Sequence, residues 1–303
     1  MIKTNIPFNK YYKFFNLLSS VLVIISLCLL IFKGLNFGVD FKGGTLIELR
    51  ANDKQITISS LRSAFSNMNL GDVAIKKFGK DSDYLIKFEK KGNTKTLIQD
   101  IKNNLTKTLG SGYEFRRVEN VGPKVSAELL KGGLIAIAAA LGAMLFYIWI
   151  RFEWQFSIGA IIALFHDVIL TIGVFSLFSL EINLSIVAAV LTIVGYSMND
   201  TVVIYDRIRE NLTKYNKISI DEISNISINE TLSRTLITSV TTLLALFSIF
   251  ILGGAILKGF SFAMILGVII GTYSSIFVAS PILKFFKVSY KTLEKEEEKI
   301  VLS

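Results

Sequence analysis

The chain has 303 residues, of which 51% are hydrophobic and 19% charged, with a formal net charge of +9. Soluble domains carry about 25% charged residues, so this composition excludes an ordinary soluble enzyme, and 12% aromatic residues exclude a disordered chain. A single cysteine and a single histidine exclude a disulfide framework and a zinc site made of Cys and His clusters. In so apolar a chain, the positive charge is typical of a membrane protein that keeps Lys and Arg in its cytoplasmic loops, and we predict no nucleic-acid partner.

Six apolar segments are long enough to cross a bilayer, which takes about 20 residues. In chain order they are 14–32, 132–150, 156–180, 182–205, 236–252 and 259–283. The first exceeds the roughly 15 residues of a signal-peptide core, so it is predicted to be an uncleaved anchor. The predicted organisation is an N-terminal segment 1–13, the first span 14–32, an outer domain with connecting segments 33–131, a membrane domain 132–283 containing a loop 206–235, and a charged tail 284–303.

The Lys and Arg residues alternate between the short loops. They stand before the first span, between the fourth and fifth, and after the sixth, whereas the link between the third and fourth spans carries only Glu181. Because basic loops stay in the cytoplasm, both termini are predicted to be cytoplasmic and segment 33–131 to lie outside.

Segment 33–131 alternates between strand and helix periodicity. Strand patterns at 47–50, 73–75, 84–88 and 113–116 and helix patterns at 61–68 and 97–105 give the order β-α-β-β-α-β, which is ferredoxin-like, with a hairpin turn at 79–83. We therefore expect an α-helical membrane protein with one α+β extracytoplasmic domain, interpreted as a binding or positioning module. Gly43 and Gly44 are predicted to form a tight turn into the first strand; no helix start follows them, which disfavours phosphate binding.

Ionisable residues inside the spans are the candidate functional residues. His166 and Asp167 lie near the middle of the third span, and Asn199 and Asp200 lie in the cytoplasmic half of the fourth. A buried Asp costs about 2.5 to 3.5 kcal/mol at a helix centre, so two acidic sites favour function over simple helix bridging. Arg234 is either a snorkelling anchor or the partner of an intramembrane acid. His166 is either a satisfied interior histidine or a proton relay, since imidazole exchanges protons near neutral pH.

Small and polar residues follow helical spacing on the later spans. On the fourth span they are Ser185, Ala188, Ala189, Thr192, Gly195, Tyr196, Asn199 and Asp200. The other side of this span is predicted to face lipid through Val187, Val190, Leu191, Val194 and Met198. On the sixth span small residues repeat every four positions, which is typical of close helix contact. These residues are Gly259, Ala263, Gly267, Gly271 and Ser275.

Segment 38–45, with the sequence GVDFKGGT, resembles a loop of the bacterial SecD/SecF family of protein-export membrane proteins. Segments 151–154, 163–168, 195–203, 206–211 and 231–239 look like the SecF members of that family, and the resemblance covers nearly the whole chain. It implies six spans with one outer domain after the first, kinship with resistance-nodulation-division transporters, and a bacterial inner-membrane location. It also implies that Asp200 and Arg234 serve proton flow; we add Asn199, Asp167 and His166 to that pathway. Ser233 stands where the family often has His.

The resemblance implies a subunit of the Sec export machinery that, with SecD, uses the proton motive force to promote preprotein translocation. The predicted partners are SecD, the SecYEG translocon with YajC and YidC as further candidates, the preprotein and membrane lipid. No enzymatic activity, cofactor or metal is predicted, and the P-loop pattern GxxxxGK[ST] is absent from the sequence. One alternative is a proton-coupled small-molecule efflux transporter of the same superfamily, which would need larger outer domains. The other is a scaffold, for which intramembrane acids would be an unneeded cost.

Overall fold

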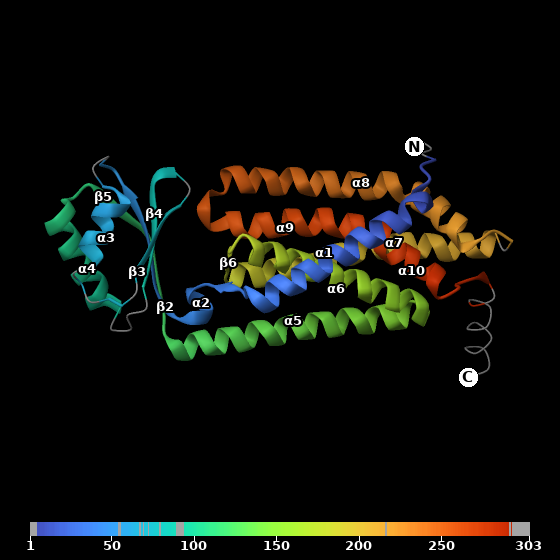
Figure 1. The fold of residues 1–303 in the computed structure, drawn as a ribbon, viewed down its shortest axis with the longest axis horizontal. Coiled ribbons are helices and arrows are strands. Elements are labelled where there is room, and N and C mark those ends of the chain that lie inside the picture. The colour runs from blue at the N-terminus through green and yellow to red at the C-terminus, as the bar shows by residue number, and fades with distance from the viewer. Residues whose placement is uncertain are drawn as a thin grey trace. The chain divides into compact units, whose positions relative to one another are not determined.

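The computed structural model describes residues 5–53, 56–66, 68, 70–71, 73–78, 80–88, 94–215, 217–290 and 292 (Figure 1). Its contacts divide the chain into two compact units. The helical unit holds the described residues of 1–36, 135–181 and 185–303, and the sheet unit holds those of 37–134 and 182–184.

Six helical segments among the described residues are long and apolar enough to cross a membrane. They are a 3₁₀ turn and α1 (Phe8–Tyr11, Tyr12–Phe32), α5 (Pro123–Arg151), α6 (Trp154–Leu177), α7 (Leu184–Lys214), α8 (Ile220–Leu252), and a segment of α9 (Gly254–Ser274), a π-helical turn (Ser275–Ala279) and α10 (Ser280–Phe285). Within the helical unit α1 packs on α6, α6 on α9, and α9 on α8 (Figure 1). The predicted fold class, six membrane helices with a small domain containing a β-sheet, is confirmed.

Several helices run well beyond the apolar segments found in the sequence. The predicted loop 206–235 is mostly helical, because α7 continues to Lys214 and α8 begins at Ile220. Arg207 holds the two extensions together, with its Nε 2.7 Å from Glu230 Oε2, and Ser219 caps α8. Hydropathy marks where the apolar run ends, whereas polar contacts and caps decide where the helix ends.

The α5 helix shows the same effect at its first turn. The prediction placed this span at 132–150, but the helix starts at Pro123, nine positions earlier by residue number. Proline is favoured at the first helical position because its fixed φ suits the helix and its missing N–H needs no partner there. The Ser126 hydroxyl donates to the Gly122 carbonyl at 3.0 Å, which satisfies a backbone acceptor just before the helix.

The sheet unit has four antiparallel strands in the order β3-β4-β2-β5. Its elements are β2 (Gly44–Ala51), α3 (Ile58–Ser66), β3 (Val73–Phe78), β4 (Lys80–Phe88), α4 (Thr94–Leu109) and β5 (Tyr113–Val121), which is the predicted order along the chain. Helices α3 and α4 lie on the same side of the sheet (Figure 1), over a core that includes Ile47, Leu49, Leu61, Phe65, Ile86, Ile101 and Leu105. The predicted turn 79–83 is too long, since Lys80 already pairs with Phe78; Gly79 lies outside the described residues.

An ion pair joins β2 to β4 in the sheet unit. Arg50 and Asp83 are cross-strand neighbours, with Nε 2.6 Å from Oδ1 and Nη2 2.8 Å from Oδ2. Such a two-point contact orients both groups. The hydrogen bonds to Asp83 raise the pKa of Arg50 above its ordinary value. The pair therefore ties the two strands together at a largely buried position.

Candidate functional site within the helical unit

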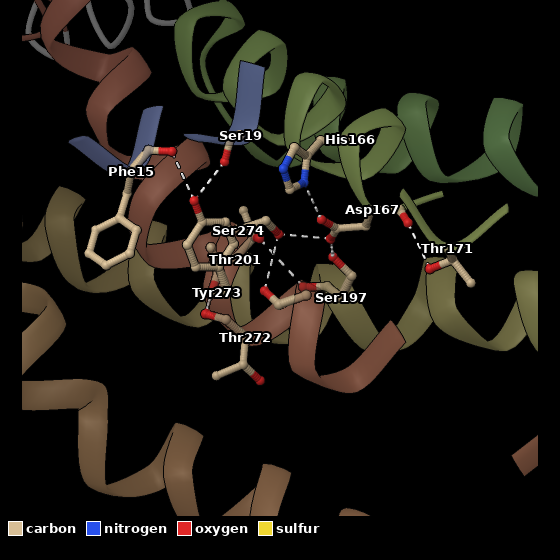
Figure 2. Close-up of polar contacts among 12 residues, drawn as sticks. Phe15, Ser19, His166, Asp167, Thr171, Ser197, Thr201, Thr272, Tyr273 and Ser274 are labelled. Carbon is tan, nitrogen blue, oxygen red and sulfur yellow. Dashed lines mark hydrogen bonds and ion pairs between the residues drawn. The ribbon is translucent and has the colours of Figure 1, made fainter. Parts of the chain in front are cut away.

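Asp167 is completely buried on α6 and is held by three other side chains (Figure 2). Its Oδ1 lies 2.8 Å from Nδ1 of His166. Its Oδ2 accepts from the Ser197 hydroxyl of α7 at 2.5 Å and from the Ser274 hydroxyl of α9 at 2.8 Å. A carboxylate with several donors is well satisfied in a buried position. Asp167 therefore joins α6, α7 and α9 at one point.

Asp200 is the second buried acid and has a much sparser environment. It lies on α7 with 3% of its surface exposed. The one hydrogen bond found to its carboxylate in the described structure comes from the Thr272 hydroxyl of α9, at a long 3.4 Å. The Thr272 hydroxyl lies 2.8 Å from that of Ser239 on α8. Hydroxyls on two helices thus form a short chain that ends at Asp200.

Arg234 does not contact either acid. It is exposed on α8, and among the described residues no ion pair within 4 Å joins it to Asp167 or Asp200. The structure therefore leaves open both sequence-based interpretations, an anchor at the end of the span and a partner of Asp200. Any direct pairing with Asp200 would require a conformation other than this one.

His166 lies between Asp167 and a groove along α1. Its Nδ1 shares a hydrogen bond with the Asp167 carboxyl group. Nε2 is buried and has no partner in the described structure. The ring stacks on Tyr273 at 6.1 Å, and the Tyr273 hydroxyl donates to the Phe15 carbonyl of α1 at 2.9 Å (Figure 2). His166 also lines the groove, which has a volume of about 640 Å³.

The close approach of α7 and α9 depends on glycines. A Cβ at Gly267 would lie 2.3 Å from Ile193 Cγ1, and one at Gly271 would lie 3.1 Å from Ser197 Cα. Real side chains do not tolerate the first distance, so position 267 needs glycine, and a side chain at position 271 would force Ser197 to shift. The predicted small-residue face of the sixth span is therefore packed against α7, and it brings Thr272 and Ser274 within reach of the two acids.

The predicted orientation of α7 is wrong for three of the five residues expected to face lipid. Val190, Val194 and Met198, expected to face lipid, are each at most 3% exposed. Val194 and Met198 belong to the hydrophobic core of the helical unit, and the glycines of α9 leave room for their neighbours Ile193 and Ser197. The exposed residues instead belong to the predicted small and polar stripe, namely Ala188, Thr192, Gly195 and Asn199. Asn199 therefore points away from its neighbour Asp200, which is buried.

Gly43 and Gly44 belong to the sheet unit, whereas the two buried acids belong to the helical unit. They follow the short helix α2 (Val39–Lys42), and their φ angles are +77° and +118°. A Cβ at Gly43 would lie 3.2 Å from Ser126 Oγ and 3.3 Å from the Val121 carbonyl oxygen. Glycine is needed at both positions because other residues rarely adopt these φ values. Their role in this conformation is structural.

The serines that surround Asp167 are not among the predicted site residues. Ser197 and Ser274 were not singled out, although Ser197 lies three positions before Asp200, and Ser274 three after Gly271. Their spacing from Asp200 and Gly271 is the only sequence pattern that points to them. This pattern is weak, because a lone Ser in an apolar helix more often donates to its own backbone. No group of three or more His, Cys, Asp and Glu residues suited to a metal ion occurs in the described part of the chain.

Comparison with known proteins identifies similar sequences over most of the chain. Residues 101–289 match the family model "Protein export membrane protein SecD/SecF, C-terminal", and residues 29–54 match "SecD/SecF GG Motif". The protein translocase subunit SecF of Rickettsia bellii (strain OSU 85-389) is 46% identical over 269 residues, covering 87% of this chain and 88% of the relative. The SecF of Rickettsia typhi (strain ATCC VR-144 / Wilmington) is 44% identical, covering 97% of this chain and 96% of the relative.

Solved structures are similar as well. The crystal structure of SecDF, a translocon-associated membrane protein from Thermus thermophilus, matches with a TM-score of 0.85 and 33% identity over 95% of this chain. A crystal structure of SecDF in a super-membrane-facing form matches with a TM-score of 0.70 and 32% identity over 99% of this chain. The chain spans only 39% and 40% of the length of these two SecDF chains.

Proposed function

The chain belongs to the SecD/SecF family of protein-export membrane proteins, and we propose that it serves as the SecF-type subunit of a Sec protein-export complex. It is a multi-pass membrane protein. Its relatives are named protein translocase subunits, and SecDF structures contain more than twice the length of this chain. We infer that SecD supplies the remaining part of the complex. We assign the chain no enzymatic activity of its own.

The observation that carries the mechanism is the sparse environment of Asp200. A buried carboxylate with a single long hydrogen bond has few donors to stabilise its ionised form, so its charge depends on what approaches it. Asp167, with three polar contacts, is suited to fixing helix positions instead. We therefore propose that Asp200 takes up and releases protons driven by the proton motive force, while Asp167 with His166 keeps α6, α7 and α9 in register.

Proton passage can supply enough energy for mechanical work. One charge crossing 100 mV carries about 2.3 kcal/mol, which shifts a two-state equilibrium by well over tenfold. We propose that a change in the protonation of Asp200 moves α7, and that Arg234 approaches Asp200 in another step of the cycle. The sheet unit would then act on a translocating preprotein. The SecYEG translocon, with YajC and YidC, is the expected site of action. A small-molecule efflux role is disfavoured because the matching relatives are named translocase subunits.

The central test replaces Asp200 in proteoliposomes that contain this chain with SecD. Asp200→Asn keeps the size of the side chain and fixes it neutral, so proton flux and force-dependent preprotein translocation should both be abolished while assembly persists. Thr272→Val removes the hydrogen bond to Asp200, worth about 1 kcal/mol, and should change the flux by up to about fivefold. Asp81→Asn is the matched control, since it makes the same acid-to-amide change on a fully exposed side chain. Wild-type flux and translocation in Asp200→Asn would refute the proposal.

The proposed orientation places both termini in the cytoplasm of a bacterium and the sheet unit outside the inner membrane. Asp81 is suited to a labelling test because its side chain is fully exposed on β4. With the native thiol removed by Cys28→Ser, an Asp81→Cys variant should react with an impermeant maleimide in intact spheroplasts. Reaction only after lysis would reverse the topology.

Partnership with SecD is tested by copurification from native membranes in mild detergent. SecD should accompany the chain, and its removal should end proton flux in proteoliposomes. A pure monomer that translocates preprotein at the rate of the complex would contradict the assignment.

A further inference from the structure

We infer that Asp40 is a positioning residue that couples movement of α7 to the sheet unit; this inference rests on the proposed function. Asp40 lies in α2, within the loop at residues 38–45. Its Oδ2 accepts a hydrogen bond from the backbone N–H of Leu184 at 2.9 Å. Leu184 is the first residue of α7, the helix that carries Asp200.

A second hydrogen bond holds the same junction. The backbone N–H of Gly38 donates to the Ile182 carbonyl at 2.8 Å. Residues 38–40 therefore hold residues 182–184 by one backbone contact and one side-chain contact. Residues 182–184 group with the sheet unit, whereas α7 from Ser185 onward groups with the helical unit. The chain thus passes from one unit to the other inside the first turn of α7.

The loop that carries Asp40 is itself fixed to the sheet. Val39 and Phe41 are buried, and Gly43 packs against Val121 and Ser126 so closely that a Cβ has no free space. The strand β2 starts at the next residue, Gly44, which pairs with Val121 of β5. A displacement of Asp40 is therefore passed directly to two neighbouring strands of the sheet.

Electrostatics favour this contact over an ordinary turn. The first backbone N–H groups of a helix lack intrahelical acceptors and carry a partial positive charge. A carboxylate is the strongest acceptor a side chain can offer there, and in this structure it comes from a residue 144 positions away in sequence rather than from the helix itself. The contact joins two distant segments, which a local cap would not do.

Helix α7 can carry a displacement from Asp200 to this junction. Sixteen residues separate Asp200 from Leu184 (200 − 184), which is about 24 Å along a helix axis. A helix that is hydrogen-bonded throughout shifts or tilts as one body over such a length. Protonation at Asp200 would therefore be felt at Leu184 as a movement of the helix end, and Asp40 would transmit it to the sheet.

The test compares Asp40→Ala with Asp40→Asn in proteoliposomes containing SecD, with Asp81→Ala as the matched loss of an acid from the same unit. Asp40→Ala should keep proton flux within about twofold of wild type while force-dependent translocation falls by about fivefold, the factor for a lost cap of about 1 kcal/mol. Asp40→Asn retains an acceptor oxygen and should restore most of the translocation. Asp81→Ala should match wild type in both measurements.

Hydrogen exchange of the Leu184 amide gives a second measurement that does not depend on transport. Exchange should accelerate in Asp40→Ala and return towards wild type in Asp40→Asn. Unchanged translocation in Asp40→Ala, or an equal fall in flux and translocation, would overturn the inference. If Asp40→Ala fails to assemble, Asp40→Asn serves as the test. Faster exchange of the Leu184 amide together with wild-type translocation in Asp40→Asn would also overturn the inference, because the contact would then be weakened without loss of transport. If the wild-type complex shows no force-dependent translocation, the proposed function is wrong. This outcome is distinct from a failure of the inference about Asp40, which concerns only the difference between the variants and wild type.

Discussion

A methyl group added at Gly267 should disrupt the contact between α7 and α9. Its Cβ would lie 2.3 Å from Cγ1, 2.5 Å from Cδ1 and 2.9 Å from Cγ2 of Ile193. Carbon atoms prefer about 3.5 to 4.0 Å, so the Ile193 side chain would have to retreat by more than about 1 Å. Ile193 is 1% exposed, so its side chain would have to repack within the interior. Overpacking of this kind costs about 1 to 3 kcal/mol, which is the expected loss for Gly267→Ala.

The second variant, Ile193→Ala, removes all three clashing atoms and alone should cost about 2 to 5 kcal/mol through the cavity it leaves. In the double variant the new methyl enters that cavity, so the combined loss should fall short of the sum by at least about 1 kcal/mol. The free energy of unfolding is measured by SDS titration of mixed micelles, followed by the fluorescence of the two tryptophans. Additive losses within about 0.5 kcal/mol would refute the packing argument.

Two further predictions concern other parts of the chain. Asp83→Asn should speed hydrogen exchange in β2 and β4 by the same factor at pH 6 and pH 9. The pKa of Arg50 is raised above its ordinary value, so the stability that the pair adds is fully present below that ordinary value, and both pH values lie far below it. A pH-dependent loss would contradict this. Asn229→Ala removes both hydrogen bonds to the Ile6 backbone, at 2.8 and 2.9 Å, and should speed exchange of the Ile6 amide by about fivefold, whereas unchanged exchange would show that this contact does not hold the N-terminal segment.

Much of the architecture was predictable because hydropathy and periodicity reflect burial. The six spans follow from apolar runs that only a bilayer or a protein interior can accommodate. The order of strands and helices in the sheet unit follows from periods of two and 3.6 residues. Intramembrane Asp167 and Asp200 were visible for the same reason, since a charge inside an apolar run is costly and therefore conspicuous. Helix ends were missed because Pro123, Ser219 and the Arg207 ion pairs lie outside apolar runs.

The orientation of α7 was not predictable from its own sequence. Valine and glycine are both compatible with a lipid-facing or a protein-facing position, and the neighbouring helix decides between them. Gly267 and Gly271 of α9 leave space for Ile193 and Ser197, which turns the apolar face of α7 inwards. The same contact brings Ser274 to Asp167, so the difference between the two acids arises from helix packing and not from either local sequence.

The exposed stripe on α7 gives a physical reason for the proposed partnership with SecD. Ala188, Thr192, Gly195 and Asn199 lie along one face that nothing in the described chain covers. The Thr192 hydroxyl donates to the Ala188 carbonyl at 2.8 Å. Among the described residues the exposed Asn199 amide has no comparable hydrogen bond, and an unpaired amide is costly in lipid. Small residues let helix backbones approach closely, and a polar amide can then bond across the contact. A partner helix on this face would also lie one residue from Asp200, so assembly and proton uptake would depend on the same helix.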